Sequence, residues 1–354
     1  MPYGGRRLHC EGNVNEKAIP AGIDAGRVSD WLDSNVDGVQ GPYEFALIAG
    51  GHSNLTFSVQ PADGPTLVLR RPPLGHVLAT AHDMEREHKI ITGVGLTDVP
   101  VPVTMGLCVD NEVNGAPFYV MRHVSGPVLH SDVEAAAMPE AERTALGADV
   151  IEVLARLHSA EPDDIGLGDL GKREDYIGRQ LRRWTRQWEN SKTRELPEME
   201  EAQRLLTESQ PEQVGAAIVH GDYRLGNMIV GDGRVRAVLD WELCTLGDPL
   251  ADVGYLMNNW VGPGEEVAGS SGPTIVGGFG ERDALLARYQ ELTGRDVSGI
   301  DYYRAFSYWR LAAIVEGVLK RYLEGAMGDS DGDTDNFRQN VENLANRALS
   351  LLRP

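Results

Sequence analysis

The stretch Val219–Glu242 decides the fold, and it reads V-H-G-D-Y-R-L-G-N-M-I-V-G-D-G-R-V-R-A-V-L-D-W-E. Two short apolar runs in and before this stretch end in polar residues that do not suit a hydrophobic core. Asp222 and Asn227 lie five residues apart, and Asp240 follows thirteen residues after Asn227. A tight loop could bring the two acids and the amide together. That set suits Mg²⁺-assisted transfer of a phosphoryl group, because one carboxylate can serve the nucleophile while an amide and a carboxylate offer hard oxygen ligands.

The composition is that of a globular protein of more than one core. A chain of 354 residues is expected to form two domains or two lobes. No apolar run approaches the roughly 18 residues of a membrane span, and no apolar segment follows Arg6 and Arg7 as in a signal peptide. The three cysteines are scattered and odd in number, which argues against a disulfide framework and predicts a cytoplasmic protein.

The formal net charge of −20 disfavours nucleic acid as a partner. Such an excess of acids is typical of a solubilising surface, and it would also attract cationic substrates. The acids are spread through the chain, which favours the first interpretation.

The pattern from Tyr43–Ile48 to Leu55–Gln60 predicts two strands joined by a glycine-rich turn. A hairpin with a glycine tip lets backbone N–H groups approach phosphate oxygens closely, although most Gly-Gly turns only reverse the chain. The candidate phosphate-binding residues of this turn are Gly50, Gly51, His52, Ser53 and Asn54.

A further strand is predicted over Thr66–Arg71 and a helix over His82–Val94. Alternation along the strand places Arg70 on the same face as Val68, from which its cation could reach phosphates. Glu87 lies on a mainly apolar face of the helix and is the natural partner of Arg70. The alternative is that both are ordinary exposed charges.

The segment Pro117–Val124 predicts a strand that ends at Ser125-Gly126-Pro127. Backbone groups at the end of this strand could pair with the edge of a purine. We place a boundary between lobes here, which divides the chain into an N-terminal arm (1–26), an N-lobe (27–125) and a helical C-lobe (126–354).

A helix predicted over Lys172–Thr193 carries an arginine stripe at spacings of three and four residues. The stripe could bind an anionic substrate tail, or it could be a solvated face that pairs with nearby acids. Farther along, Val261–Gly280 is rich in Gly, Ser and Pro and predicts a long loop that is either a substrate lid or a surface loop. The arginines are Arg179, Arg182, Arg183 and Arg186.

With these pieces in order, the sequence resembles the aminoglycoside phosphotransferase family, the small-molecule relatives of protein kinases. The match is carried by His220-Gly221-Asp222-x4-Asn227 and by Asp240-Trp241-Glu242 downstream. The resemblance implies an α+β, two-lobed protein-kinase-like fold, in which a small antiparallel β-sheet forms the N-lobe and a mostly helical C-lobe follows. It implies that Asp222 orients or deprotonates the acceptor hydroxyl, that Asn227 and Asp240 hold Mg²⁺ on ATP, and that His220 supports the loop.

The resemblance also assigns the nucleotide site. The Gly50–Asn54 hairpin is similar to the loop that covers the nucleotide, and Met121 falls at the gatekeeper position. The Arg122 carbonyl and the Val124 N–H would then face adenine. Arg70 stands where the family has a strand lysine, which puts the pair of Arg70 with Glu87 in doubt.

The amino-acid sequence around the site is similar to one branch of the family, the kinase-like domains joined to some acyl-CoA dehydrogenases. For that branch the resemblance implies a small-molecule acceptor, a hydroxyl on an acyl or acyl-CoA compound, and the arginine stripe would suit such an anion. The overall acidity would suit a cationic aminoglycoside instead. A third possibility is a nucleotide-binding regulator with little turnover, for which the departure at Arg70 leaves room.

Overall fold

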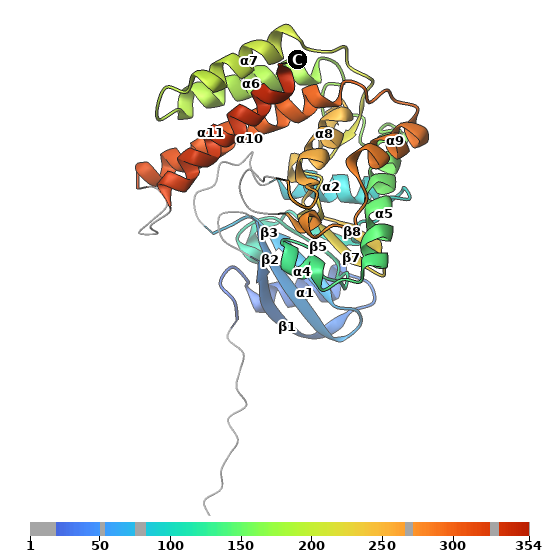
Figure 1. Ribbon diagram of the computed structural model, residues 1–354. Helices are drawn as coiled ribbons and strands as arrows, with labels where there is room; N and C mark the ends of the chain where they lie inside the picture. The colour runs from blue at the N-terminus through green and yellow to red at the C-terminus, as the bar shows by residue number, and fades with distance from the viewer. Residues whose placement is uncertain (1–18, 50–53, 75–82, 266–271, 326–332, 354) are drawn as a thin grey trace, which may run out of the picture. The chain divides into compact units, whose positions relative to one another are not determined.

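The computed structural model describes residues 19–49, 54–74, 83–265, 272–325 and 333–353 (Figure 1). The chain forms two compact units. The first comprises Met1–Met84 and Met105–Met121, and the second comprises Glu85–Thr104 and Arg122–Pro354. The predicted N-lobe, residues 27–125, differs from the first unit because residues 85–104 pack with the second. The part of the predicted arm before residue 19 lies outside the described residues.

The first unit is built on a five-stranded sheet with the order β1-β2-β3-β5-β4. Strands β1 to β3 pair antiparallel, with Phe57 opposite both Leu47 and Leu69. β4 is an edge strand of this sheet. The strands are β1 (Gln40–Ala49), β2 (Leu55–Asp63), β3 (Leu67–Arg71), β4 (Thr104–Cys108) and β5 (Phe118–Arg122).

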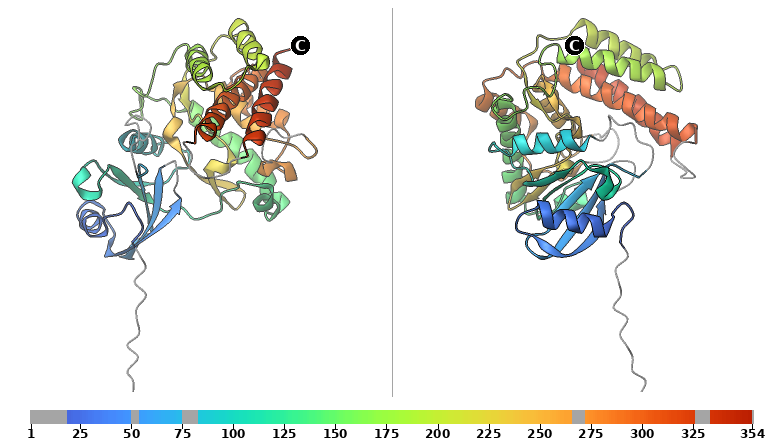
Figure 2. Two further views of the ribbon diagram at one scale, coloured as in Figure 1. Left: turned by 90° about the vertical axis from the view of Figure 1, so that its left-hand side faces the viewer. Right: turned by 180° about the vertical axis from the view of Figure 1, so that it is seen from behind.

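Helix α1 (Ala25–Asn35) covers one face of this sheet (Figure 2). The Asp24 carboxylate caps the helix by accepting the N–H of Arg27 at 3.2 Å. The apolar side of α1 buries Val28 and Leu32 completely. Together with strand residues these side chains form the core of the unit, which contains Val28, Leu32, Val36, Phe45, Leu55, Phe57, Val59, Leu67, Leu69, Cys108, Phe118 and Val120. A short helix, α3 (Asn111–Asn114), joins β4 to β5.

The second unit is mostly helical, so the predicted α+β class with a small antiparallel sheet and a helical remainder is confirmed. In all three views α10 and α11 run side by side, and α6 and α7 pack against them (Figures 1 and 2). No helix in the described ranges is both long and apolar enough to cross a membrane. The helices are α2 (Met84–Val94), α4 (Asp132–Ala136), α5 (Glu140–Ser159), α6 (Tyr176–Ser191), α7 (Pro197–Glu208), α8 (Leu250–Asn259), α9 (Arg282–Thr293), α10 (Ile300–Leu323) and α11 (Thr334–Leu352).

Two small antiparallel sheets in the second unit carry the stretch Val219–Glu242. β6 (Ala217–Val219) pairs with β9 (Thr245–Gly247), and β7 (Met228–Gly231) pairs with β8 (Arg234–Val238). The motif from His220 to Asn227 therefore begins directly after β6, and Asp240 lies just beyond the end of β8.

Candidate active site

His220 anchors the loop that follows β6, and its side chain is completely buried. Its Nε2 lies 2.9 Å from the carbonyl oxygen of Leu239, and its Nδ1 lies 3.2 Å from the backbone nitrogen of Asp222. The carbonyl needs a donor and the N–H needs an acceptor, so the network assigns the neutral tautomer with the proton on Nε2. The expected supporting role of His220 is therefore what its hydrogen bonds provide.

Asp252, on α8, holds the same loop from the other side. It is 1% exposed, and its carboxylate accepts the backbone N–H groups of His220 at 2.6 Å and Gly221 at 2.8 Å. It also lies 3.3 Å from Nε2 of His158. Burial alone would raise the pKa of Asp252, but the hydrogen bonds from His158 and Gly221 outweigh it and hold that pKa below the ordinary value.

Asp222 is positioned by three donors, two from its own loop and one from α8. Its Oδ2 accepts Nδ2 of Asn227 at 2.6 Å, and its Oδ1 accepts the hydroxyl of Tyr255 and Nε of Arg224, the latter at 3.3 Å. The Asp222 side chain remains 21% exposed. A carboxylate that is held on both oxygens but still reachable is suited to orient a hydroxyl or to accept its proton.

Asn227 and Asp240 are brought together by the pairing of β7 with β8. The carbonyl of Asn227 accepts the N–H of Leu239 at 2.8 Å, so Asp240 follows directly after a residue bonded to Asn227. Asp240 itself has a φ of +65°, an uncommon left-handed conformation for a residue other than glycine. The turn is anchored by Trp241, which is fully buried and donates Nε1–H to the Val238 carbonyl at 3.0 Å.

The donor set at this point fits Mg²⁺. Nδ2 of Asn227 donates to the main-chain oxygen of Asp222 at 2.9 Å as well as to its carboxylate. These two bonds occupy the amide nitrogen, so the amide oxygen is the atom of Asn227 that could bind a cation. Within the described ranges no cluster of three or more His, Cys, Asp or Glu could hold a metal by itself. An ion at Asn227 and Asp240 would thus need further oxygen ligands, as Mg²⁺ obtains from phosphates and water.

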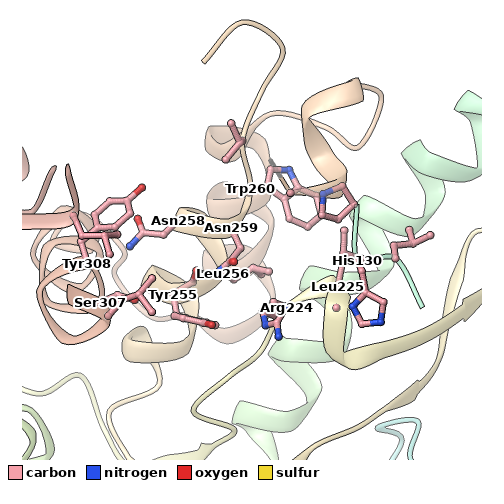
Figure 3. Close-up of a pocket in the computed structure, with 17 residues that line it drawn as sticks. His130, Arg224, Leu225, Tyr255, Leu256, Asn258, Asn259, Trp260, Ser307 and Tyr308 are labelled. Carbon is pink, nitrogen blue, oxygen red and sulfur yellow. Dashed lines mark hydrogen bonds between the residues drawn. The ribbon is translucent and has the colours of Figure 1, made fainter. Parts of the chain in front are cut away.

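A pocket lies next to Asp222, and two of the residues that bond Asp222, Arg224 and Tyr255, line it (Figure 3). Its cavity volume is about 130 Å³, and the pocket is partly open to solvent. Its described lining includes a cationic side chain, Arg224, and an imidazole, His130, but no Asp or Glu. The remaining lining residues are Leu129, Leu225, Gly226, Leu256, Asn258, Asn259, Trp260, Val261, Gly272, Pro273, Ser307, Tyr308, Leu311 and Leu344.

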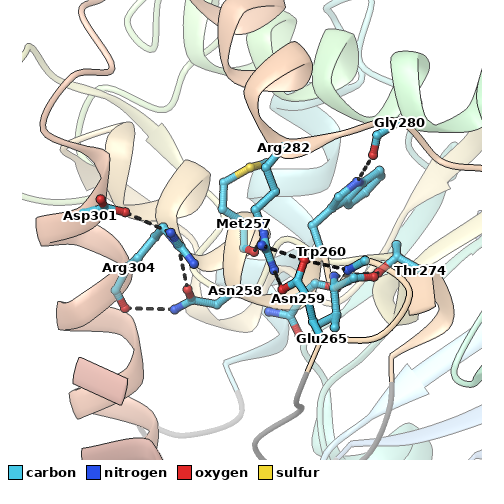
Figure 4. A network of polar contacts seen from close by, with 12 residues as sticks. Met257, Asn258, Asn259, Trp260, Glu265, Thr274, Gly280, Arg282, Asp301 and Arg304 are labelled. Atoms are coloured by element: carbon cyan, nitrogen blue, oxygen red, sulfur yellow. Dashed lines mark hydrogen bonds and ion pairs between the residues drawn. The ribbon is translucent and has the colours of Figure 1, made fainter. Parts of the chain in front are cut away.

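The described ends of the Val261–Gly280 loop are held in place beside this pocket (Figure 4). Thr274 accepts the N–H of Val261 at 2.8 Å, and its hydroxyl donates to the Val261 carbonyl at 3.0 Å. Arg282 forms two bonds to Glu265, at 3.0 and 2.7 Å. Since Val261, Gly272 and Pro273 line the pocket, part of the loop is a wall of it.

Of the predicted nucleotide-binding residues, Gly50, Gly51, His52 and Ser53 lie outside the described residues. Asn54 is buried just before β2, Arg70 is half-buried in β3, and Met121 and Arg122 end β5, with Val124 just beyond. Arg70 belongs to the first unit and Glu87, 3% exposed on α2, to the second. The roles of these residues, and the pairing of Arg70 with Glu87, stay predictions.

The arginine stripe lies on α6 and is partly engaged with its own surroundings. Arg182 forms an ion pair with Asp175 at 2.7 Å, and the guanidinium of Arg183 lies 5.3 Å from the ring centre of Trp184. None of the four is among the lining residues of the pocket beside Asp222. Their role in substrate binding stays a prediction, and the four are Arg179, Arg182, Arg183 and Arg186.

Sequence reasoning missed Arg224, Tyr255 and Arg310. Arg224 is two residues from Asp222, and Tyr255 is three residues from Asp252 on one helix, so spacing offered a signal for both. Arg310, on α10, donates to the Gly221 carbonyl at 3.0 Å. It lies far from the motif in sequence, and no local pattern indicates it.

A model of the phosphotransferase enzyme family matches residues 44–296 of the chain. Two curated relatives are similar over most of it. Acyl-CoA dehydrogenase family member 10 of Mus musculus is 37% identical over 80% of this chain, and family member 11 of Gallus gallus is 34% identical over 86%. The chain spans only 27% and 40% of the length of these two relatives.

Solved structures show the same fold. One is the crystal structure of a Ralstonia eutropha protein that has been assigned to the aminoglycoside phosphotransferases. Its sequence is 34% identical to this chain, the TM-score is 0.81, and the match covers 93% of this chain and 98% of that one. A thermostable mutant of aminoglycoside phosphotransferase APH(4)-Ia, in ternary complex with ADP and hygromycin B, is 17% identical with a TM-score of 0.59, covering 92% and 98%. The chain belongs to the phosphotransferase enzyme family, and it has the kinase-like fold of these structures.

Proposed function

We propose that this protein transfers the γ-phosphoryl group of ATP to a hydroxyl of a small molecule that is neutral or anionic and partly apolar. A hydroxyacyl compound or its CoA thioester is the acceptor class that we favour. One observation supports this choice above others: the pocket beside Asp222 is lined by Arg224, His130 and many apolar side chains, without an acid among its described lining residues.

The charge of the pocket separates the two acceptor classes. Aminoglycosides carry several amino groups and need carboxylates around them, because a buried cation without a partner is costly. A hydroxyacyl compound instead presents an apolar chain to leucines and an anionic or carbonyl group to Arg224. The names of the curated relatives, which include acyl-CoA dehydrogenases, agree with an acyl acceptor.

The residues of the chain divide the work. Asp222 would orient the acceptor hydroxyl and take its proton as the oxygen attacks the γ-phosphorus. Arg224, 3.3 Å from Asp222, would offset negative charge on the transferred group. Asn227 and Asp240 would hold Mg²⁺, which neutralises charge on the phosphates when bound. Nucleotide use is supported by fold relatives whose structures contain ADP or GDP.

The test is to incubate the protein with Mg²⁺ and ATP against two acceptor panels, one of hydroxyacyl compounds with their CoA thioesters and one of aminoglycosides. Mass spectrometry would detect the phosphorylated product. We expect product from the first panel, and Asp222→Asn should lower kcat by at least about 100-fold, the usual contribution of a general base.

Each failure has its own meaning. An Asp222→Asn variant as active as the wild type would contradict the mechanism. Product from the aminoglycosides alone would contradict the acceptor class and leave the transfer intact. A rise in melting temperature with Mg²⁺ and ATP, without product from either panel, would favour the nucleotide-binding regulator instead.

A further inference from the structure

We propose that Tyr255 is a positioning residue for Asp222, and that Arg310 holds Tyr255 in place. The hydroxyl of Tyr255 fixes one oxygen of the Asp222 carboxylate while Asn227 fixes the other. This inference rests on the phosphoryl transfer proposed above.

Two donors reach different oxygens of the same carboxylate. Tyr255 donates to Oδ1 of Asp222, to which Arg224 adds a longer bond of 3.3 Å, and Asn227 donates to Oδ2 at 2.6 Å. A carboxylate held through one oxygen can rotate about its Cβ–Cγ bond, whereas one held through both has a fixed plane. Burial, followed by the negative charge of Asp222 and the hydrogen bond to it, raises the pKa of Tyr255. The phenol therefore stays protonated and can act only as the donor in this bond.

Tyr255 is itself constrained by two helices. On α8 it follows Asp252 by three residues, and Asp252 bonds the backbone of the loop that carries Asp222. From α10, the guanidinium of Arg310 lies 5.5 Å from the centre of the Tyr255 ring, within the range of a cation–π contact. Arg310 also donates to the Gly221 carbonyl at 3.0 Å, so one side chain joins Tyr255 to the residue before Asp222.

Tyr255 also lines the acceptor pocket, where its side chain extends from α8 toward Arg224 (Figure 3). An acceptor in this pocket would therefore meet Asp222 beside the Tyr255 hydroxyl. Removing that hydroxyl should leave the Asp222 carboxylate less firmly oriented, while the ring still forms its part of the pocket wall. The loss should appear in the rate of transfer rather than in nucleotide binding.

The variant that tests this is Tyr255→Phe, which keeps the ring, its contact with Arg310 and the wall of the pocket. ADP formation would be measured with Mg²⁺ and ATP, both without an acceptor and with the acceptor found by the panel. We expect kcat to fall roughly 10- to 100-fold and the KM for ATP to change by less than about twofold. The matched control is Tyr43→Phe, which removes a tyrosine hydroxyl that donates to Asp33 at 2.6 Å in the first unit, and which should leave kcat unchanged.

A double-mutant cycle separates positioning from general support of the fold. Because Tyr255 acts through Asp222, Tyr255→Phe should cause no further loss in the Asp222→Asn background. The proposal is overturned if Tyr255→Phe keeps the wild-type kcat, or if it lowers kcat by the same factor in both backgrounds. A wild-type protein without any ATP turnover would instead overturn the phosphoryl transfer, and this proposal with it.

Discussion

Gly221 lies between the buried His220 and Asp222, with a φ of +87°. A Cβ at this position would lie 2.9 Å from Cβ of Leu243 and 3.0 Å from its carbonyl oxygen. Both the backbone conformation and the space next to it therefore require glycine, so that the motif can turn from the buried histidine to the reachable aspartate.

We predict that Gly221→Ala destabilises the protein more than Gly115→Ala. Gly115 also has a positive φ, +70°, but a Cβ there would meet nothing within 4 Å. The left-handed conformation should cost about 1–2 kcal/mol in both variants, and the overpacking against Leu243 should add about 1–3 kcal/mol only in the first. Urea unfolding would measure both free energies, and equal losses would refute the steric argument.

The buried side chain of His158 should make the stability of the protein depend on pH. Its Nδ1 accepts the hydroxyl of Tyr289 at 2.7 Å and its Nε2 faces Asp252, and burial lowers the pKa of His158 below its ordinary value of 6.5. Below pH 6.5 the unfolded chain therefore binds a proton that the folded protein does not. Stability should fall on acidification, by up to about 1.4 kcal/mol per pH unit from this group.

The variant His158→Gln should be less stable at neutral pH but should lose less stability between pH 6.5 and about pH 5. Asp252 does not interfere in this window, since its ordinary pKa is 3.8 and the folded protein lowers it. Chemical unfolding at several pH values gives both slopes. Identical slopes for the variant and the wild type would contradict the assignment to His158.

At the scale of elements, one turn of α8 supplies two side chains that hold the loop carrying Asp222. Asp252 holds the backbone of the loop from His220 to Asn227 and Tyr255 holds the side chain of Asp222, so both reach the same loop from one helix face. The end of α8 then supplies Asn258 and Asn259 to the pocket. A shift of this helix would move the Asp222 carboxylate and the wall of the pocket together.

A second contact between elements fixes the connection from α6 to α7 onto α10. Glu316, on α10, is completely buried and accepts the N–H and the hydroxyl of Thr193, both at 2.7 Å, and Nη1 of Arg194 at 2.9 Å. Arg194 also reaches Glu342 of α11 at 3.2 Å, but the Glu342 side chain is 41% exposed.

We therefore predict unequal effects of two matched substitutions on the same arginine. Glu316→Gln leaves Arg194 without its buried partner and should reduce the free energy of unfolding by about 3–5 kcal/mol. Glu342→Gln removes a largely solvated partner and should cost less than about 1 kcal/mol. Urea unfolding of the two variants would decide, and similar losses would show that burial of Glu316 is not what matters.

At the scale of the whole molecule the main feature is the negative net charge, because 53 Asp and Glu outnumber 33 Lys and Arg. With a net charge of −20, the negatively charged side chains repel one another in the folded state. Raising the ionic strength from about 0.01 to about 0.15 M shortens the Debye length from about 30 to about 8 Å. We expect the melting temperature at neutral pH to rise by at least about 2 °C, measured by calorimetry.

The control for this effect is the same salt series near the isoelectric point of about 4.8, where the net charge vanishes and the rise should shrink. A fall in melting temperature with salt at neutral pH would mean that screened ion pairs outweigh the general repulsion. The pocket beside Asp222 is a local exception to this acidity, because its described lining carries Arg224 and no acid.

Much of the fold could be read from local patterns. The helix predicted over His82–Val94 ends at the observed residue and differs by two residues at its start, and the strand Leu67–Arg71 differs by one residue from its prediction. These elements are marked by apolar periodicity and by glycine and proline at their ends. The short strands β6 and β9 were harder to foresee, because three residues give no period and their pairing is long-range.

The sequence by itself determined the chemistry that the site can offer. The spacing of Asp222, Asn227 and Asp240 depends on one loop and one hairpin, which are local structures that a short stretch can specify. Only the tertiary structure decided what surrounds Asp222. Tyr255 reaches Asp222 and Arg310 reaches the preceding Gly221 because α8 and α10 pack beside the loop, and side-chain contacts between distant elements leave no spacing in the sequence. The pocket beside Asp222, built from α8, α10, α11 and loop residues, was decided in the same way.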